Sequence, residues 1–181
     1  MLGKESDDID IALDDMFGEE FAKLIDAKCN TGDKKGHFGV IKANNEKSKH
    51  LETATIKVDG HDIDLVNLRS EEYAEESRIP TMKMGTPTED ALRRDLCFNA
   101  LFYNINVGKI EDFTERGVED LRNGICRTPL EPVQTFLDDP LRVVRTIRFA
   151  NRFNFTIVPE LIEAAKFKGV RVSIVLIVIN V

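Results

Sequence analysis

The chain is poor in the residues from which disulfide frameworks and zinc sites are built. Its 181 residues include three cysteines and three histidines. Cys29, Cys97 and Cys126 are odd in number and far apart, which indicates reduced thiols in an intracellular compartment. The histidines show no metal-ligand spacing and stand at positions 37, 50 and 61. A disulfide-stabilised domain and a zinc site are therefore both disfavoured.

A basic charge balance and a long apolar run are also missing. The formal net charge is -7, so no overall positive field draws the chain to nucleic acid or membrane, and any nucleic-acid contact must use a local patch. The apolar ending VRVSIVLIVINV is shorter than the roughly 20 residues of a membrane span. We expect it to be a buried strand or an aggregation-prone segment. The first residues turn acidic almost at once, so we expect no signal or transit peptide in them.

What remains is an ordinary globular composition, 42% hydrophobic and 31% charged, at a length that suits about one domain. Alternating or β-branched runs predict strands in the first half, at 7–13, 38–42, 53–58 and 63–68. Asp59-Gly60 predicts a hairpin between the last two strands. Glu19–Ala27 has helical spacing, and the polar stretch Ser70–Gly85 has no period and predicts a long loop.

The second half reads as mainly helical. Thr86-Pro87-Thr88-Glu89 is a capping box and predicts the start of a helix that carries ALRRDLCFNALFYN. A short strand and turn follow at KIEDF. A last helix begins at Asp138 or Asp139, with Pro140 in its first turn, and runs through RVVRTIRFANRF. The sequence thus predicts an α/β first part followed by helices.

Acidic residues interrupt the first strand, in the stretch SDDIDIALDD. Alternation places Ile9, Ile11 and Leu13 toward a core and Asp8 and Asp10 together on the other face. Two neighbouring carboxylates repel, and a divalent cation relieves the repulsion because hard cations bind carboxylate oxygens. Asp64, in GHDIDLVNL, is a candidate third acid. An exposed edge strand with solvated acids is the alternative for the first pair, and a solvated face for Asp64.

The last helix carries a stripe of arginines. At about 100° per residue, Arg142, Arg145, Arg148 and Arg152 share one arc. Four apolar residues lie opposite, at positions 143, 144, 147 and 150. A stripe with arginine and no lysine favours phosphate or base recognition, and a merely solvated basic face is the alternative.

Together these segments resemble the tRNA nucleotidyltransferases, or CCA-adding enzymes, and the related poly(A) polymerases of the same class. The resemblance runs from about Leu2 to Phe167 and looks most like the eukaryotic, plant- or fungus-like branch. It rests on four ordered segments: GKESDDIDIALD, RRDLCFNA, RGVEDLRNG and DDPLRVVRTIRF. They are similar, in turn, to the metal-binding strand, the ribose- and triphosphate-binding motif, the motif that couples head to neck, and the nucleotide-selecting motif.

The resemblance implies roles for particular residues. Asp8 and Asp10 would hold Mg²⁺ in a two-metal site, and Asp64, from the strand pattern above, is the third candidate of the catalytic set. Gly117 and Asp120 would couple head to neck. The nucleotide-binding residues would be Arg93, Arg94, Asp95, Asn99, Asp139, Arg142, Arg145 and Arg148, with Asp139 and Arg142 as the pair that selects the base.

The implied fold is α/β (α+β), a nucleotidyltransferase head with a polymerase-β-like mixed sheet at residues 1–130. The start of a helical neck would follow at 131–168, and an apolar tail outside the family pattern at 169–181. The implied activity is addition of CCA to tRNA 3′ ends from CTP and ATP. A poly(A) polymerase, or a fragment that only binds nucleotide or RNA, is the alternative.

The implied partners are the tRNA 3′ end, CTP and ATP, with no membrane and no obligate protein partner. The implied location is intracellular, with cytoplasm, nucleus, mitochondrion and plastid not distinguished. Two family segments have no counterpart: the G-G-x-V-R-D segment before the acidic strand, and the neck, body and tail after ELIEAAKFKG. We therefore expect weak or no activity from these 181 residues alone.

Overall fold

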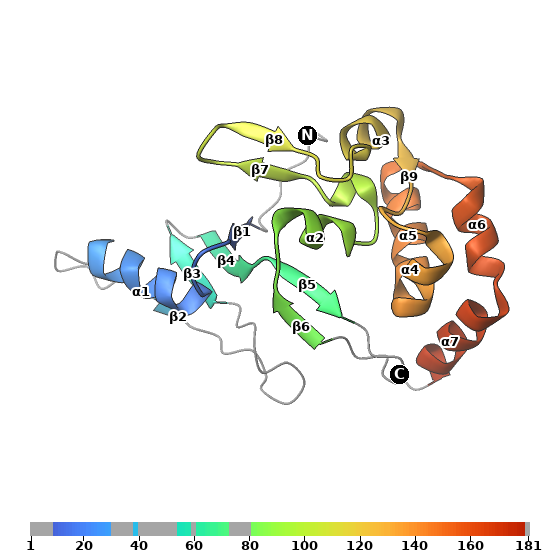
Figure 1. The fold of residues 1–181 in the computed structure, drawn as a ribbon, viewed down its shortest axis with the longest axis horizontal. Helices are drawn as coiled ribbons and strands as arrows, with labels where there is room; N and C mark the ends of the chain where they lie inside the picture. The colour runs from blue at the N-terminus through green and yellow to red at the C-terminus, as the bar shows by residue number, and fades with distance from the viewer. Residues whose placement is uncertain (1–8, 30–37, 40–53, 59–60, 73–80, 180–181) are drawn as a thin grey trace. The chain divides into compact units, whose positions relative to one another are not determined.

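The computed structural model describes residues 9–29, 38–39, 54–58, 61–72 and 81–179. The chain divides into two compact units, which we call unit 1 (residues 1–86) and unit 2 (residues 87–181) (Figure 1).

Unit 1 is a mixed sheet with one helix. Its elements are β1 (Ile9–Leu13), α1 (Gly18–Cys29), β2 (Phe38–Gly39), β3 (Ala54–Val58), β4 (His61–Asn67), β5 (Arg69–Glu72) and β6 (Thr81–Met84). The main sheet has the order β1-β4-β3-β2. β1 pairs with β4 in parallel, whereas β3 pairs with β4 and with β2 in antiparallel fashion. The prediction of an α/β fold with a mixed sheet is confirmed.

One face of this sheet forms the core of unit 1. Alternate residues of β1, β3 and β4 pack with α1 in a single apolar cluster: Ile11, Leu13, Ala54, Ile56, Ile63 and Leu65 from the strands, and Phe21, Ala22 and Ile25 from the helix. Because side chains alternate along a strand, Asp10 and Asp64 lie on the opposite face of the sheet. The predicted helix at Glu19–Ala27 is confirmed, since it lies within α1.

Unit 2 is mainly helical, and its helices α4 to α7 gather together (Figure 1). Its elements are α2 (Pro87–Leu92), the 3-10 turn η1 (Cys97–Asn99), β7 (Phe102–Asn104), β8 (Lys109–Glu111), α3 (Gly117–Asn123), β9 (Ile125–Cys126), α4 (Pro132–Asp138), α5 (Leu141–Phe153), β10 (Thr156–Ile157), α6 (Pro159–Lys166) and α7 (Lys168–Ile179). Its core includes Leu96, Phe136 and Leu161, each at most 2% exposed. Phe98 makes edge-to-face contacts with three further rings, Phe149, Phe153 and Phe155.

Two predictions about the middle of the chain are wrong. The supposed loop Ser70–Gly85 contains most of an antiparallel hairpin, β5 and β6, in which Arg69 pairs with Met84; residues 73–80 lie outside the described part. The two strands pair through backbone hydrogen bonds, and their side chains show no alternating pattern from which a strand could be predicted. The helix that starts after Thr86 ends at Leu92 rather than continuing to Asn104. Leu96 is extended, and the Cys97 amide donates to the distant Arg127 carbonyl, so tertiary contacts end the helix.

Two expectations about the last third also need correction. The apolar ending is not a strand: α7 runs through most of it, and its Val170 is buried against the core of unit 2. The branched residues of this segment favour a strand, but β propensity depends on context. Packing of the helix against the core has outweighed that preference here. On α5, Val143 and Ala150 are buried as predicted, but Val144 and Ile147 are 49% and 57% exposed. Among the described residues, no helix is long and apolar enough to cross a membrane.

Phe136→Ala is expected to destabilise the chain by about 3–5 kcal/mol, because it removes a large buried ring and leaves a cavity. Phe136 is 1% exposed, whereas Ile105 is 73% exposed. Ile105→Ala is the control and should change the free energy of unfolding by less than about 0.5 kcal/mol. Urea unfolding followed by circular dichroism measures both, and equal effects would contradict the assigned core.

Candidate functional site

The acidic face of unit 1 carries two of the three predicted catalytic acids. Asp10 on β1 is in register with Asp64 on the parallel strand β4, so both carboxylates project from the same face at neighbouring positions. The Thr55 hydroxyl donates to Oδ1 of Asp64 at 2.6 Å. Asp10 is exposed and Asp64 half-buried, and Asp8 lies outside the described residues. Two such carboxylates suit a hard divalent cation, although the described residues form no cluster of three or more acidic, histidine or cysteine ligands.

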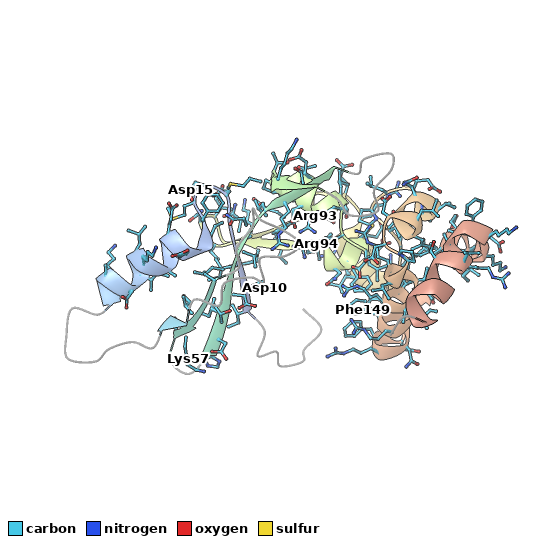
Figure 2. All side chains as sticks on the ribbon, turned by 90° about the horizontal axis from the view of Figure 1, so that it is seen from below. Asp10, Asp15, Lys57, Arg93, Arg94 and Phe149 are labelled. Atoms are coloured by element: carbon cyan, nitrogen blue, oxygen red, sulfur yellow. The ribbon has the colours of Figure 1, made fainter. Side chains whose placement is uncertain are left out.

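A buried carboxylate in unit 2 holds the two arginines of the RRD segment. Asp90 is 1% exposed. Its Oδ1 accepts from Arg93 Nε at 3.0 Å and from Arg93 Nη2. Its Oδ2 accepts from Arg94 Nε and Nη2, at 3.0 and 2.8 Å. Both guanidiniums therefore turn the same edge to one carboxylate, and Figure 2 shows Arg93 and Arg94 close to each other.

The charge of Asp90 is stabilised by these partners. Burial on its own raises the pKa of a carboxyl, because it penalises the charged form. Here the charges and hydrogen bonds of Arg93 and Arg94 outweigh that effect and hold the pKa of Asp90 below its ordinary value of 3.8. Asp90 was not predicted as a site residue, although its place three and four residues before the two arginines on a helix is a signal for such pairing.

Asp95 lies between two side chains that were also predicted to bind nucleotide. It is 4% exposed. Its Oδ1 accepts from Asn99 Nδ2 at 3.2 Å, and its Oδ2 accepts from Arg145 Nε at 2.6 Å. The ion pair between Arg145 and Asp95 joins helix α5 to a segment fifty residues earlier in the chain.

Arg142 attaches the start of α5 to the same segment. Its Nη2 donates to the Arg93 carbonyl at 2.8 Å, and its Nε lies 3.9 Å from Oδ2 of Asp139. The Asp139 Oδ1 accepts from the Leu141 amide at 3.0 Å. Helix α5 begins at Leu141, so the predicted start at Asp138 or Asp139 lies two to three residues too early. The Arg148 guanidinium lies 5.0 Å from the centre of the Phe149 ring, which the Arg145 guanidinium also approaches, at 5.6 Å.

Gly117 and Asp120 are buried at the start of α3. A Cβ on Gly117 would lie 2.5 Å from the Cys97 carbonyl oxygen, so only glycine fits there. Burial raises the pKa of the Asp120 carboxyl above 3.8, and Arg127, 3.7 Å away, offsets only part of this rise. Oδ2 of Asp120 has no hydrogen-bond partner in the described part of the chain.

The thiols of unit 2, Cys97 and Cys126, are unsuited to nucleophilic attack or metal binding. Burial, together with the Asp120 carboxylate, raises the pKa of Cys97 to about 11. Burial and the Asp120 and Asp95 carboxylates raise that of Cys126 to about 11 as well. Both thiols are therefore protonated at neutral pH, which makes them poor nucleophiles and poor metal ligands.

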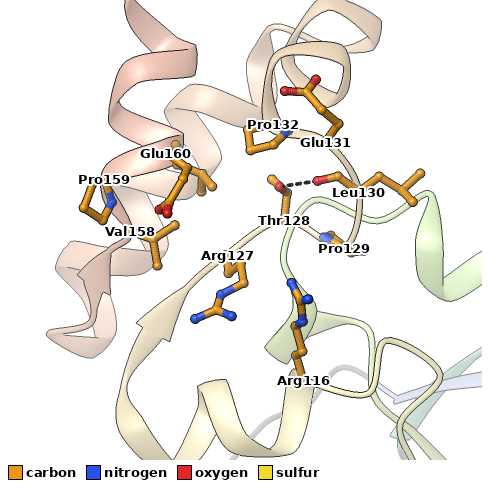
Figure 3. A pocket seen from close by; sticks show the side chains of 11 residues that line it. Arg116, Arg127, Thr128, Pro129, Leu130, Glu131, Pro132, Val158, Pro159 and Glu160 are labelled. Carbon is orange, nitrogen blue, oxygen red and sulfur yellow. Dashed lines mark hydrogen bonds between the residues drawn. The ribbon is translucent and has the colours of Figure 1, made fainter.

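A cavity of about 640 Å³ opens elsewhere in unit 2 (Figure 3). Arg116, Arg127 and Glu160 line it together with an apolar wall that includes Pro129 and Val158. None of the residues predicted to bind nucleotide lines this cavity. The charged network around Asp90 and Asp95, and not this cavity, is therefore the candidate site of unit 2.

Comparison with known proteins identifies the family. Residues 1–127 match the family described as the Poly A polymerase head domain. The chain belongs to this family. In Saccharomyces cerevisiae, the mitochondrial CCA tRNA nucleotidyltransferase is 58% identical over 165 residues, which cover 88% of this chain and 30% of that protein.

Solved structures agree with this membership. A structure of a CCA-adding enzyme, apo form II, has a TM-score of 0.73 at 30% identity and covers 91% of this chain and 37% of the other. The CCA-adding enzyme of Bacillus stearothermophilus in complex with CTP has a TM-score of 0.65 at 26% identity, over 90% of this chain and 35% of the other. The chain thus spans about a third of the length of these proteins.

Asp90→Asn is expected to destabilise the chain by about 1.5–3 kcal/mol at neutral pH, because hydrogen bonds to two charged groups are weakened. Asp90 has a lowered folded-state pKa, so its stabilisation is present above the ordinary value of 3.8 and is lost as the pH falls through the folded-state pKa. The difference between wild type and variant should therefore shrink below about pH 4. Urea unfolding at several pH values measures this, and a pH-independent difference would contradict the pairing.

Gly117→Ala is expected to destabilise the chain by about 1–3 kcal/mol, because the new methyl group meets backbone. Glu119→Ala, at an exposed position of the same helix, is the control and should change stability by less than about 0.5 kcal/mol. Thermal unfolding compares the two, and a Gly117→Ala variant as stable as the control would show that the contact with Cys97 is not tight.

Proposed function

We propose that the chain forms the nucleotidyltransferase head of a tRNA nucleotidyltransferase, which adds C, C and A to tRNA 3′ ends from CTP and ATP. The observation that carries the proposal is the network of unit 2, in which Arg142 donates to the Arg93 carbonyl and Arg145 pairs with Asp95. The names of the similar proteins, and the CTP complex of one of them, support the same reading.

The acidic face of unit 1 would hold the metal. Asp8 and Asp10 would supply carboxylate oxygens for Mg²⁺, and Asp64, beside Asp10 on the neighbouring strand, would complete the catalytic set. A two-metal site lowers the pKa of an attacking hydroxyl and stabilises the leaving pyrophosphate. The Thr55 hydroxyl fixes the orientation of Asp64.

The RRD segment would bind the sugar and the triphosphate. Arg93 and Arg94 would neutralise phosphate charge, while Asp90 holds their guanidiniums in place. The carboxylate of Asp95 would accept a hydrogen bond from the 2′-hydroxyl of the ribose, which favours ribonucleotides. Asn99 helps to orient Asp95.

The first turn of α5 would select the base. Asp139 offers an acceptor and Arg142 a donor fork, and the two side chains lie next to each other. Cytosine and adenine each present an amino donor beside a ring-nitrogen acceptor, whereas uracil and guanine present the opposite order. A wrong base would leave buried polar groups unpaired, which gives strong discrimination. Arg145 and Arg148, further along the same helix, complete the nucleotide-binding set.

The domain limits follow from the same proposal. Residues 1–130 would form the head, 131–168 the start of the helical neck, and 169–181 a tail outside the family pattern. Gly117 and Asp120, both buried in unit 2, would couple head to neck. The tRNA 3′ end, CTP and ATP would be the partners, with no membrane or obligate protein partner, in an intracellular compartment.

Extension of a tRNA that lacks its CCA end tests the proposal. With Mg²⁺, the weak activity expected of these 181 residues should add C from CTP alone, and C followed by A when both nucleotides are present. Tailing from ATP alone would instead indicate a poly(A) polymerase. Magnesium-dependent CTP binding without any incorporation would identify the chain as a fragment that binds nucleotide and does not catalyse.

Asp10→Ala is expected to lower nucleotide addition by at least about a hundredfold, because it removes a carboxylate from the proposed two-metal site. The exposed Asp14→Ala, at the end of the same strand, is the matched control and should retain activity. Primer extension measures both variants, with circular dichroism to confirm folding. Retained activity of Asp10→Ala would remove Asp10 from the metal site.

Arg142→Ala is expected to relax the choice of C and A over U and G more than it weakens triphosphate binding, because the donor fork to the base is lost. Misincorporation of UTP and GTP should rise by about tenfold or more relative to CTP. Competition between the four nucleotides in the extension assay measures this. An unchanged preference for C and A would contradict the assignment of the base-selecting pair.

A further inference from the structure

The Arg145 guanidinium is paired with a carboxylate of the protein, that of Asp95. Its Nε donates to Oδ2 of Asp95 at 2.6 Å, and the guanidinium carbon lies 5.6 Å from the centre of the Phe149 ring. The Arg145 side chain is 44% exposed, whereas that of Asp95 is 4% exposed. The ring and the carboxylate together fix the guanidinium, and the guanidinium in turn fixes the buried carboxylate.

Asp95 keeps acceptor capacity after these contacts are made. A carboxylate has about four acceptor positions, two on each oxygen. Asn99 donates to Oδ1 and Arg145 to Oδ2, so each oxygen is oriented by one donor of the protein. Each oxygen can then accept from a further donor such as a sugar hydroxyl.

We propose that Arg145 is a positioning residue that sets the preference for ribonucleotides over 2′-deoxyribonucleotides, by orienting the carboxylate of Asp95. This inference rests on the proposed function and refines the part of Arg145 in it. The residue acts on the sugar through Asp95, whereas the base is read by Asp139 and Arg142. Loss of Arg145 should therefore change the choice of sugar and leave the choice of base intact.

Helix α5 has other contacts that hold it in place, so the role of Arg145 can be tested without unfolding the chain. Arg142 fastens the same helix to the Arg93 carbonyl through a hydrogen bond of 2.8 Å. Phe149 and Phe153 pack against the core of unit 2 from the same helix. An Arg145 variant keeps these contacts and loses the pairing with Asp95 and the stacking of its guanidinium on Phe149.

Calorimetric titration of the purified chain with CTP and with dCTP, in the presence of Mg²⁺, tests the inference without requiring catalysis. Wild type should bind CTP more tightly than dCTP. In Arg145→Met the preference for CTP should fall by about tenfold, the usual effect of disturbing a hydrogen bond to a charged group. The affinity for CTP should fall, and the affinity for dCTP should stay unchanged. Arg145→Lys should regain part of the preference, since an ammonium group can also pair with Asp95.

Two further variants separate this role from a structural one. Arg152 stacks on Phe153 at 5.5 Å, as Arg145 does on Phe149, but the described residues give it no carboxylate partner. Arg152→Met should therefore keep the wild-type ratio of CTP to dCTP affinity. In an Asp95→Ala background, Arg145→Met should produce no further change in the ratio, because coupled residues are not additive.

Three results would overturn the inference: a wild-type ratio in Arg145→Met, an equal loss of CTP and dCTP affinity, or additive effects with Asp95→Ala. A wild-type chain that binds CTP and dCTP equally would also overturn it, because Asp95 would then not read the sugar. If Arg145→Met fails to fold by circular dichroism, Arg145→Gln takes its place with the same expectation. A chain that prefers CTP but never extends tRNA would leave the inference standing and would favour the nucleotide-binding fragment over the proposed catalytic function.

Discussion

Two buried carboxylates, Asp90 and Asp95, organise the charged side of unit 2. A carboxylate removed from water is strongly destabilising unless cations and hydrogen-bond donors surround it. Asp90 meets this requirement with Arg93 and Arg94, and Asp95 with Asn99 and Arg145. The arginines are therefore held in place by the need to compensate buried charge, and their orientation is fixed before any ligand arrives. Such preorganisation reduces the conformational entropy lost on binding.

The same requirement joins segments that are far apart in the sequence. Arg145 and Arg142 come from α5, and their partners Asp95 and Arg93 come from the segment after α2. The apolar core lies behind this junction, since Leu96 is fully buried and Phe98 packs on rings from α5. A helix proposed to read the base is in this way fixed to a segment proposed to bind sugar and phosphate.

Part of this arrangement is predictable from the sequence. The alternation of Ile and Asp in β1 places Asp10 on the face opposite the core, and the pattern of β4 does the same for Asp64. The start of α5 follows from Pro140 to within two to three residues, since the helix begins at Leu141. Local patterns suffice in these cases because period and capping are properties of neighbouring residues.

The remaining features depend on contacts that a local pattern does not contain. The pairing of Arg145 with Asp95 spans fifty residues. Helix α2 ends at Leu92, although the residues that follow also favour a helix. The hydrogen bond from the Cys97 amide to the Arg127 carbonyl holds the next segment in another conformation. The hairpin of β5 and β6 forms from a polar stretch without period, and α7 forms from residues that favour strands. Backbone pairing and packing against the core decide these elements, and they outweigh local propensity.

The central claim is that the network of unit 2 binds a nucleoside triphosphate and distinguishes its base without a nucleic-acid template. Calorimetric titration of the purified chain with CTP, ATP, UTP and GTP, in the presence of Mg²⁺ and the absence of RNA, tests it most directly. We predict binding of CTP and ATP at about tenfold or more higher affinity than UTP and GTP, because Asp139 and Arg142 match only the first two bases. Equal affinity for all four nucleotides, or no binding of any, would contradict the claim.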